Sequence, residues 1–164
     1  MYTFTLAVQE DLEVVYRLIN ERMDWMVLKG IKQWDKEHYW SVYPKSYYAK
    51  QVELGQLYVL KKENEVVGAI VLYDEDDNYK DNEPLDSFYL HNFVTSLKEP
   101  GAGKKVIFEV EELGKRVGKQ AIRLDCLVNN QFLNDYYEQL GYDVIGEVVD
   151  GIYHGIKREK LIAA

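Results

Sequence analysis

The spacing of apolar side chains predicts alternating strands and helices along the first third of the chain. Apolar and polar residues alternate from Met1 to Val8, the pattern of a half-buried strand. From Glu10 to about Lys29 the apolar positions recur with a helical period, which predicts a helix that ends at Gly30. Pro44 is expected to begin a second helix that reaches Gly55, because proline is favoured in the first helical turn. A stretch rich in aromatic residues separates these two helices.

The middle of the chain predicts strands. Residues 56–62 and 65–73 are strand-like and are joined by the polar pair Glu63-Asn64, so we expect an antiparallel hairpin. Residues 74–84 form a polar, acidic loop, which either attracts a cation or is simply solvated. Residues 88–95 are rich in aromatic and β-branched side chains and are expected to form the next strand.

The last third predicts a helix, a strand, a helix and a hairpin. Apolar residues at helical spacing predict a helix that ends at Gly118. Residues 121–128 alternate as a strand does, and residues 130–140 are helical in pattern. Residues 142–149 and 153–157 are expected to pair across Asp150-Gly151. In the helices, the expected apolar faces consist of Leu12, Val15, Leu18, Ile19, Met23, Met26 and Val27, then Val106, Ile107, Val110, Leu113 and Val117, then Phe132, Leu133, Tyr136 and Leu140.

A glycine-containing turn, Lys98 to Lys105, joins the fourth strand to the helix that follows. The first N–H groups of a helix have no carbonyl partner, and glycine lets an anion approach the backbone. The turn therefore suits a phosphate, although an ordinary tight bend has the same pattern. It lacks the glycine and the Ser or Thr of a P-loop, since positions 98 and 105 are lysine. It also lacks the third glycine of the dinucleotide fingerprint, where Val106 stands.

Composition and charge limit the classes of function. The 164 residues suit one domain, and the single cysteine, Cys126, excludes an intrachain disulfide and favours a reducing, cytoplasmic setting. We interpret Cys126 as a core residue rather than a nucleophile. The formal charge of −8 disfavours nucleic acid and anionic membranes as partners. Neither a signal peptide nor a transmembrane helix is expected, because the longest apolar run has eight residues.

Two short motifs, together with the order of elements, resemble the GNAT superfamily of acyl-CoA-dependent N-acyltransferases over nearly the whole chain. The family motif (Gln/Arg)-x-x-Gly-x-(Gly/Ala) is similar to residues 98–103, with lysine at its first position. The second motif, an asparagine and then a tyrosine seven residues later before a Gly-aromatic pair, is similar to Asn130, Tyr137 and Gly141-Tyr142. The resemblance implies an α/β (α+β) fold, with a GNAT-like mixed, mostly antiparallel central sheet flanked by helices and a splayed fourth and fifth strand, in a single domain over residues 1–164.

The resemblance also implies acetyl-CoA as the acyl donor and an amine as the acceptor. The residues that it assigns to coenzyme A lie at the end of the fourth strand, in the turn and before the last helix: Phe93, Val94, Thr95, Lys98, Glu99, Pro100, Gly101, Ala102, Gly103, Lys104, Lys105 and Asn130. A backbone N–H of residues 93–95 would stabilise the oxyanion. The implied reaction is direct transfer of an acetyl group to a primary amine of a small molecule or peptide, in a ternary complex. A homodimer is a family-level expectation.

The family pattern nominates Tyr137 as the acid that protonates the leaving thiolate, whereas by its surroundings alone it could simply pack like Tyr136. Three candidates remain for the base: His91, Asp125 and a water relay. His91 could equally be a satisfied core histidine, and Asp125 could support nearby backbone. Among the aromatic residues of the first helices, we expect Trp25, Trp34 and Tyr39 to contact the acceptor, and about half of these aromatic residues to be core. An alternative function is a non-catalytic acyl-CoA-binding regulatory module with the same fold.

Overall fold

The computed structural model describes residues 1–31 and 36–162, whose strands form one mixed sheet in the order β1-β2-β3-β4-β5-β7-β6. The chain divides into two compact units, Met1–Leu72 with Asn92–Glu109 and Tyr73–His91 with Val110–Ala164, so β3, β4 and α4 each contribute residues to both. Strand β2 is antiparallel to β1 and to β3, and β7 is antiparallel to β5 and to β6, whereas β4 and β5 are parallel. The expected mixed, mostly antiparallel fold flanked by helices is confirmed, and the single domain stays a prediction.

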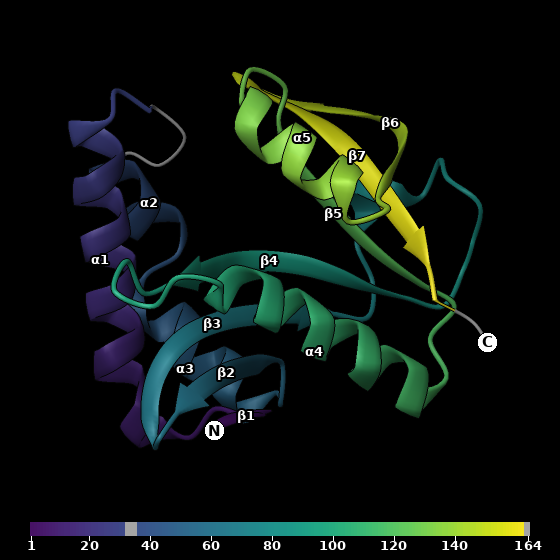
Figure 1. Ribbon diagram of the computed structural model, residues 1–164. Helices are drawn as coiled ribbons and strands as arrows, with labels where there is room; N and C mark the ends of the chain where they lie inside the picture. Colours follow the sequence, from purple (N-terminus) through teal and green to yellow (C-terminus); the bar gives the residue numbers. More distant parts are fainter. Residues whose placement is uncertain (32–35, 163–164) are drawn as a thin grey trace. The chain divides into compact units, whose positions relative to one another are not determined.

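The first unit contains β1, the β2–β3 hairpin and the helices between β1 and β2, together with the end of β4 and the start of α4 (Figure 1). Its elements are β1 (Tyr2–Leu6), η1 (Gln9–Asp11), α1 (Leu12–Leu28), α2 (Lys36–Val42), α3 (Lys45–Glu53), β2 (Leu57–Lys62) and β3 (Glu65–Tyr73, whose last residue belongs to the second unit). The hairpin of β2 and β3 is confirmed: both turn residues, Glu63 and Asn64, have the positive φ angles that a tight two-residue turn requires. Helix α2 was not expected from the sequence.

The second unit is built on β5 (Ala121–Leu127), α5 (Gln131–Gln139), β6 (Asp143–Asp150) and β7 (Tyr153–Leu161). The short helix η2 (Asp77–Tyr79) lies in the acidic loop before β4 (Ser87–Thr95), and α4 (Ala102–Val117) leads towards β5. Strand β7 pairs with β5 on one side and β6 on the other, which confirms the expected C-terminal hairpin (Figure 1).

The helical periodicity located most of the core but misplaced its edges. The expected α1 positions are buried up to Met26, whereas Val27 is exposed. In α4, Val106, Ile107 and Val110 are buried, but Val117 is exposed in the last turn. In α5 the expected apolar face is wrong: Phe132 is exposed, and Leu133, Tyr136 and Leu140 are only half-buried. The buried residues of this helix are Asn134 and Tyr137. None of the helices in the described ranges combines the length and apolarity required to cross a bilayer.

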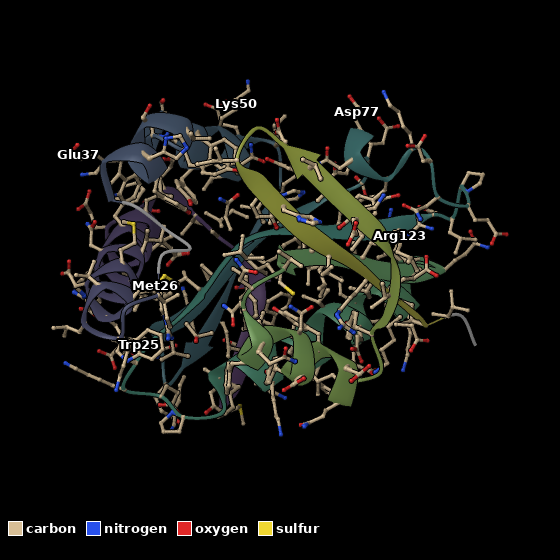
Figure 2. The ribbon with its side chains drawn as sticks, turned by 90° about the horizontal axis from the view of Figure 1, so that it is seen from above. Trp25, Met26, Glu37, Lys50, Asp77 and Arg123 are labelled. Carbon is tan, nitrogen blue, oxygen red and sulfur yellow. The ribbon has the colours of Figure 1, made fainter. Side chains whose placement is uncertain are left out.

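The parallel ladder between β4 and β5 contains three residue pairs and ends at Tyr89 and Arg123. Arg123 is 1% exposed, and its guanidinium makes three hydrogen bonds within the second unit (Figure 2). Nε donates to Glu159 Oε2 at 2.7 Å, Nη1 to the Tyr89 hydroxyl at 3.2 Å, and Nη2 to the Glu83 carbonyl at 2.6 Å. One buried cation therefore joins β4, β5, β7 and the acidic loop.

Arg123→Met should lower the free energy of unfolding by about 3 kcal/mol, because it leaves the largely buried Glu159 carboxylate without its cation. The control is Arg116→Met in the exposed last turn of α4, where we expect a change within about 0.5 kcal/mol. Urea unfolding followed by circular dichroism measures both. Equal losses in the two variants would contradict the anchoring role of Arg123.

Candidate functional site

Three hydrogen bonds hold the turn before α4 in place within the first unit. Ser96 N–H donates to the Val67 carbonyl of β3 at 2.8 Å. The Glu99 carboxylate accepts from the Tyr2 hydroxyl at 2.6 Å and from Lys62 Nζ at 2.9 Å, and these hydrogen bonds lower the pKa of Glu99. The Glu99 side chain, which the family resemblance assigned to coenzyme A, thus holds the turn against β1 and β2.

Among the residues described, two backbone N–H groups at the start of α4 have no acceptor. Ala102 N–H donates to the Glu99 carbonyl and Lys105 N–H to the Gly101 carbonyl, whereas the N–H groups of Gly103 and Lys104 find no partner within the described part of the chain. Gly101 has a φ of +86°, the left-handed conformation that glycine adopts without strain. Unpaired N–H groups at a helix N-terminus are an anion site, so this turn fits the pyrophosphate of coenzyme A.

Two of the three lysines of the turn are available to a phosphate. Lys98 and Lys104 are exposed, and neither ammonium makes an ion pair with any described residue. Lys105 instead pairs with Glu109 at 2.9 Å and lies over the Phe108 ring. Of the remaining predicted contacts in the turn, Pro100 is exposed and Ala102 is fully buried.

Gly68 of β3 allows the first turn of α4 to pack closely on the sheet. A Cβ atom at this position would lie 3.1 Å from Val106 Cγ2 and 3.4 Å from Thr95 Cγ2. A larger residue would therefore push against α4 and the end of β4. The sequence analysis did not single out Gly68, and a glycine inside an apolar strand was the signal that pointed to such a close approach.

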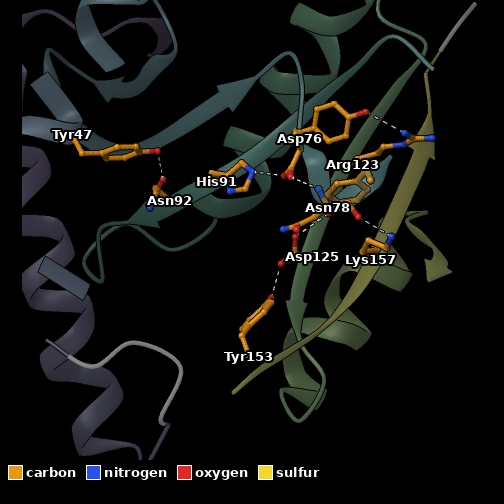
Figure 3. A network of polar contacts seen from close by, with 11 residues as sticks. Tyr47, Asp76, Asn78, His91, Asn92, Arg123, Asp125, Tyr153 and Lys157 are labelled. Carbon is orange, nitrogen blue, oxygen red and sulfur yellow. Dashed lines mark hydrogen bonds and ion pairs between the residues drawn. The ribbon is translucent and has the colours of Figure 1, made fainter. Parts of the chain in front are cut away.

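Strand β4 turns at Asn92, which has a φ of +53°, a conformation that costs a non-glycine residue energy. Its side chain accepts from the Tyr47 hydroxyl at 2.8 Å (Figure 3) and donates to the Tyr39 hydroxyl at 3.2 Å. These bonds from two helices hold the kink that sets the course of residues 93–95. In that segment Val94 is buried, while Phe93 and Thr95 are half-buried.

The predicted acceptor contacts occupy different surroundings. Trp25 is half-buried on α1, and its ring lies 5.0 Å from the Arg22 guanidinium, which donates to the Thr95 carbonyl at 2.9 Å (Figure 2). Tyr39 is buried among aromatic rings and hydrogen-bonded to Tyr48, and burial raises its pKa to about 12. Trp34 lies outside the described residues.

In the second unit, the predicted acid Tyr137 differs from the other buried tyrosines. Its ring packs against Tyr136 and Tyr142, and burial, with nearby Cys126 next in effect, raises its pKa. Its hydroxyl makes no hydrogen bond in the described ranges, whereas the hydroxyls of the other buried tyrosines there are bonded: Tyr16, Tyr39, Tyr48, Tyr79, Tyr89 and Tyr142. Tyr137 is therefore a protonated donor without an acceptor among the residues that the structure describes.

Two asparagines place α5, and with it Tyr137. Asn130 caps the helix, since its Oδ1 accepts from Leu133 N–H at 3.1 Å; its contact with coenzyme A stays a prediction. Asn134 is buried and donates to the Leu127 carbonyl, while its Oδ1 accepts from Arg158 Nε at 3.3 Å. Cys126 is buried beside Asn134, and burial raises the pKa of its thiol to about 11, as suits the expected core residue. Asn134 was not predicted as a structural residue, because nothing distinguishes it from an ordinary polar residue in a helical run.

The two side-chain candidates for the base are both held by neighbours in the second unit (Figure 3). The Asp125 carboxylate accepts from the Tyr79 hydroxyl at 3.0 Å and from the Tyr153 hydroxyl at 2.5 Å, so each oxygen has a donor. His91 Nε2 lies 2.8 Å from Asp76 Oδ2, and its other ring nitrogen has no partner among the residues described. The His91–Asp76 pair was not predicted, because its members are fifteen positions apart and Asp76 was only one carboxylate of an acidic loop.

Comparison with known proteins identifies the family. The Acetyltransferase (GNAT) family matches residues 15–142. The chain is 26% identical to the uncharacterized N-acetyltransferase YesJ of Bacillus subtilis (strain 168), over 93% of this chain and 87% of that protein. A GNAT-family acetyltransferase structure from Listeria monocytogenes 4b F2365 superposes with a TM-score of 0.80 at 21% identity, covering 98% of this chain and 94% of the other.

A further solved structure carries the ligand. PaiA N-acetyltransferase from Thermoplasma acidophilum, in complex with coenzyme A, has a TM-score of 0.72 at 17% identity and covers 98% of this chain and 99% of its own. At these identities the structural likenesses establish the fold, while the family match spans most of the sequence. The chain is a member of the GNAT acetyltransferase family, a family of enzymes that bind coenzyme A.

Proposed function

We propose that this protein transfers the acetyl group of acetyl-CoA directly to a primary amine of a small molecule or peptide, in a ternary complex. The observation that carries the proposal is Tyr137, a buried tyrosine whose hydroxyl keeps its proton and lacks a hydrogen-bond partner among the described residues. A module that only bound coenzyme A would have no need of such a donor. The family supports acetyl transfer as the activity.

The turn of residues 98–105, which leads into α4 (the α4 turn), is the part of the chain that would hold the cofactor. The N–H groups of Gly103 and Lys104 would donate to pyrophosphate oxygens, and the ammonium groups of Lys98 and Lys104 would offset the phosphate charge. Acetyl-CoA, when bound, supplies the acetyl group as a reactive thioester. The backbone of Phe93, Val94 and Thr95 would contact the end of acetyl-CoA that carries the acyl group. The positive φ of Asn92 determines the course of this backbone.

Deprotonation of the acceptor requires a base. An amine with a pKa near 10.4 is almost fully protonated at pH 7, and exposing its lone pair costs about 4 to 5 kcal/mol. Asp125 is poorly suited to this task, because two tyrosine hydroxyls already occupy its oxygens. His91 retains a ring nitrogen without a partner among the described residues. We therefore assign His91 as the base that accepts the proton of the amine.

Tyr137 then supplies the other proton. Expulsion of a thiolate, whose conjugate acid has a pKa near 8.5, is assisted by a positioned phenol. Because burial raises the pKa of Tyr137 above the usual 10, its hydroxyl is protonated throughout the neutral range. The formal charge of −8 favours a cationic acceptor in the encounter. Release of coenzyme A thiol across a panel of monoamines, diamines and peptides with free amino termini tests the activity.

Gly101→Ala should weaken the binding of acetyl-CoA by about tenfold, because an alanine disfavours the left-handed backbone that presents the α4 N–H groups. Gly118→Ala is a matched control: Gly118 has the same φ of +86°, and a Cβ there also meets no atom within 4 Å, but it follows the opposite end of α4. Both variants should lose similar stability. Titration calorimetry should show weaker binding for Gly101→Ala alone, and equal affinities would refute the assignment of this turn to the cofactor.

Tyr137→Phe should lower kcat by about a hundredfold and leave the Kd of acetyl-CoA nearly unchanged, because it removes only the donated proton. Tyr136→Phe is its control, a half-buried tyrosine one position earlier on α5. Steady-state assays should be run where the chemical step limits turnover. Unchanged kcat in Tyr137→Phe would rule out the acid role, and tight acetyl-CoA binding without transfer to any amine would favour the regulatory module.

A further inference from the structure

The Asp76 carboxylate serves two partners, one with each oxygen. Asp76 precedes η2, and its Oδ1 accepts from Asn78 N–H at 2.9 Å, which caps that short helix. Its Oδ2 lies 2.8 Å from His91 Nε2 on β4 (Figure 3). The Asp76 side chain is only 10% exposed. Asp76 therefore joins the acidic loop to the histidine that we assign as the base.

The chemistry of Asp76 determines which His91 nitrogen carries the proton. Burial alone would raise the pKa of Asp76, but the hydrogen bonds from His91 and from Asn78 N–H outweigh it and lower the pKa. Asp76 is thus ionised near neutral pH, and a carboxylate can only accept. The bond must be donated by the Nε2–H of His91, which leaves the lone pair of a neutral ring on Nδ1.

The surroundings of His91 keep the ring in place and leave it accessible. The Tyr73 ring lies 4.6 Å from the imidazole, centroid to centroid. The Lys157 ammonium, which also lowers the pKa of Asp76, is held by the Asn78 carbonyl at 3.0 Å and by Asn82 Oδ1 at 2.8 Å. The His91 side chain is 22% exposed, and within the described residues its Nδ1 has no hydrogen-bond partner.

We propose that Asp76 is a positioning residue for acetyl transfer: it holds His91 in the Nε2–H tautomer, so that Nδ1 receives a proton from the ammonium of the acceptor. This inference rests on the proposed function. In the step, an N–H bond of the ammonium breaks and an Nδ1–H bond forms, which turns neutral imidazole into imidazolium beside the Asp76 carboxylate. The carboxylate stabilises that new charge, much as the aspartate of a catalytic triad does.

Asp76→Asn tests the proposal because asparagine has one acceptor oxygen for two donors. If that oxygen keeps the bond from Asn78 N–H, the amide NH₂ group faces His91 Nε2 and forces the proton onto Nδ1. The lone pair needed by the acceptor is then lost. We expect kcat to fall by about a hundredfold, with acceptor KM and acetyl-CoA affinity little changed.

Asp77→Asn is the matched control, since it removes the same charge one residue later from an exposed position (Figure 2). We expect its kcat to stay within about twofold of the wild type. The tautomer is measured independently of activity by the ¹⁵N chemical shifts of the imidazole nitrogens. His91→Gln assigns the signals among the three histidines of the chain.

The outcomes separate this inference from the proposed function. Wild-type protein with a protonated Nε2, together with a selective loss in Asp76→Asn, supports the positioning role. A wild-type ring protonated at Nδ1 overturns it even if Asp76→Asn does not fold, and so does equal activity of Asp76→Asn and Asp77→Asn. Wild-type protein that binds acetyl-CoA but acetylates no amine overturns the proposed function instead, whichever tautomer is found, and the base role of His91 with it.

Discussion

The course of β4 is the constraint on which the rest of the structure depends. Its parallel ladder with β5 ends at Tyr89 and Arg123, and three residues later the strand turns through the left-handed conformation of Asn92. A regular strand would continue to pair and would alternate its side chains without interruption. Residues 90–95 continue β4 beyond its ladder with β5, and Asn92 turns the strand within this stretch. His91 precedes the kink, and the backbone proposed to face the acyl group follows it.

Polar contacts within each unit hold the residues of β4 on either side of this point. In the second unit the buried Arg123 bonds to Glu159, Tyr89 and the Glu83 carbonyl. In the first unit the hydroxyls of Tyr39 and Tyr47 hold the Asn92 side chain. These groups are satisfied, whereas the groups proposed to meet the substrates are not. Three donors have no partner within the described residues: the N–H groups of Gly103 and Lys104 and the Tyr137 hydroxyl. An unpaired polar group costs free energy, and proteins tolerate such a cost mainly at functional sites.

The sequence predicted what depends on local pattern. Helical periodicity located α1, α4 and α5, and the polar pair Glu63-Asn64 between two strand-like runs located the β2–β3 hairpin. The glycines of the α4 turn and the residues Asn130 and Tyr137 were visible as motifs. Helix α2 was missed, because it has seven residues and an aromatic composition that shows no clear period.

The sequence could not predict features that depend on distant partners. The hydroxyls of one tyrosine from α2 and one from α3 bond to the Asn92 side chain and support its positive φ. The pairing of His91 with Asp76, and the two hydroxyls that occupy Asp125, likewise join residues far apart in the chain. These contacts narrow the choice of base, which the sequence left open among His91, Asp125 and water.

We propose that the N–H groups of Gly103 and Lys104, which have no acceptor among the described residues, hold the pyrophosphate of the cofactor. The most direct measurement is the amide ¹H and ¹⁵N chemical shifts of Gly103 and Lys104 during titration with coenzyme A, compared with titration by phosphate-free pantetheine. We predict large shifts for both amides with coenzyme A and small ones with pantetheine, because only the former brings an anion to accept their hydrogen bonds. Saturation of the protein with coenzyme A while both amide signals stay in place would contradict the account.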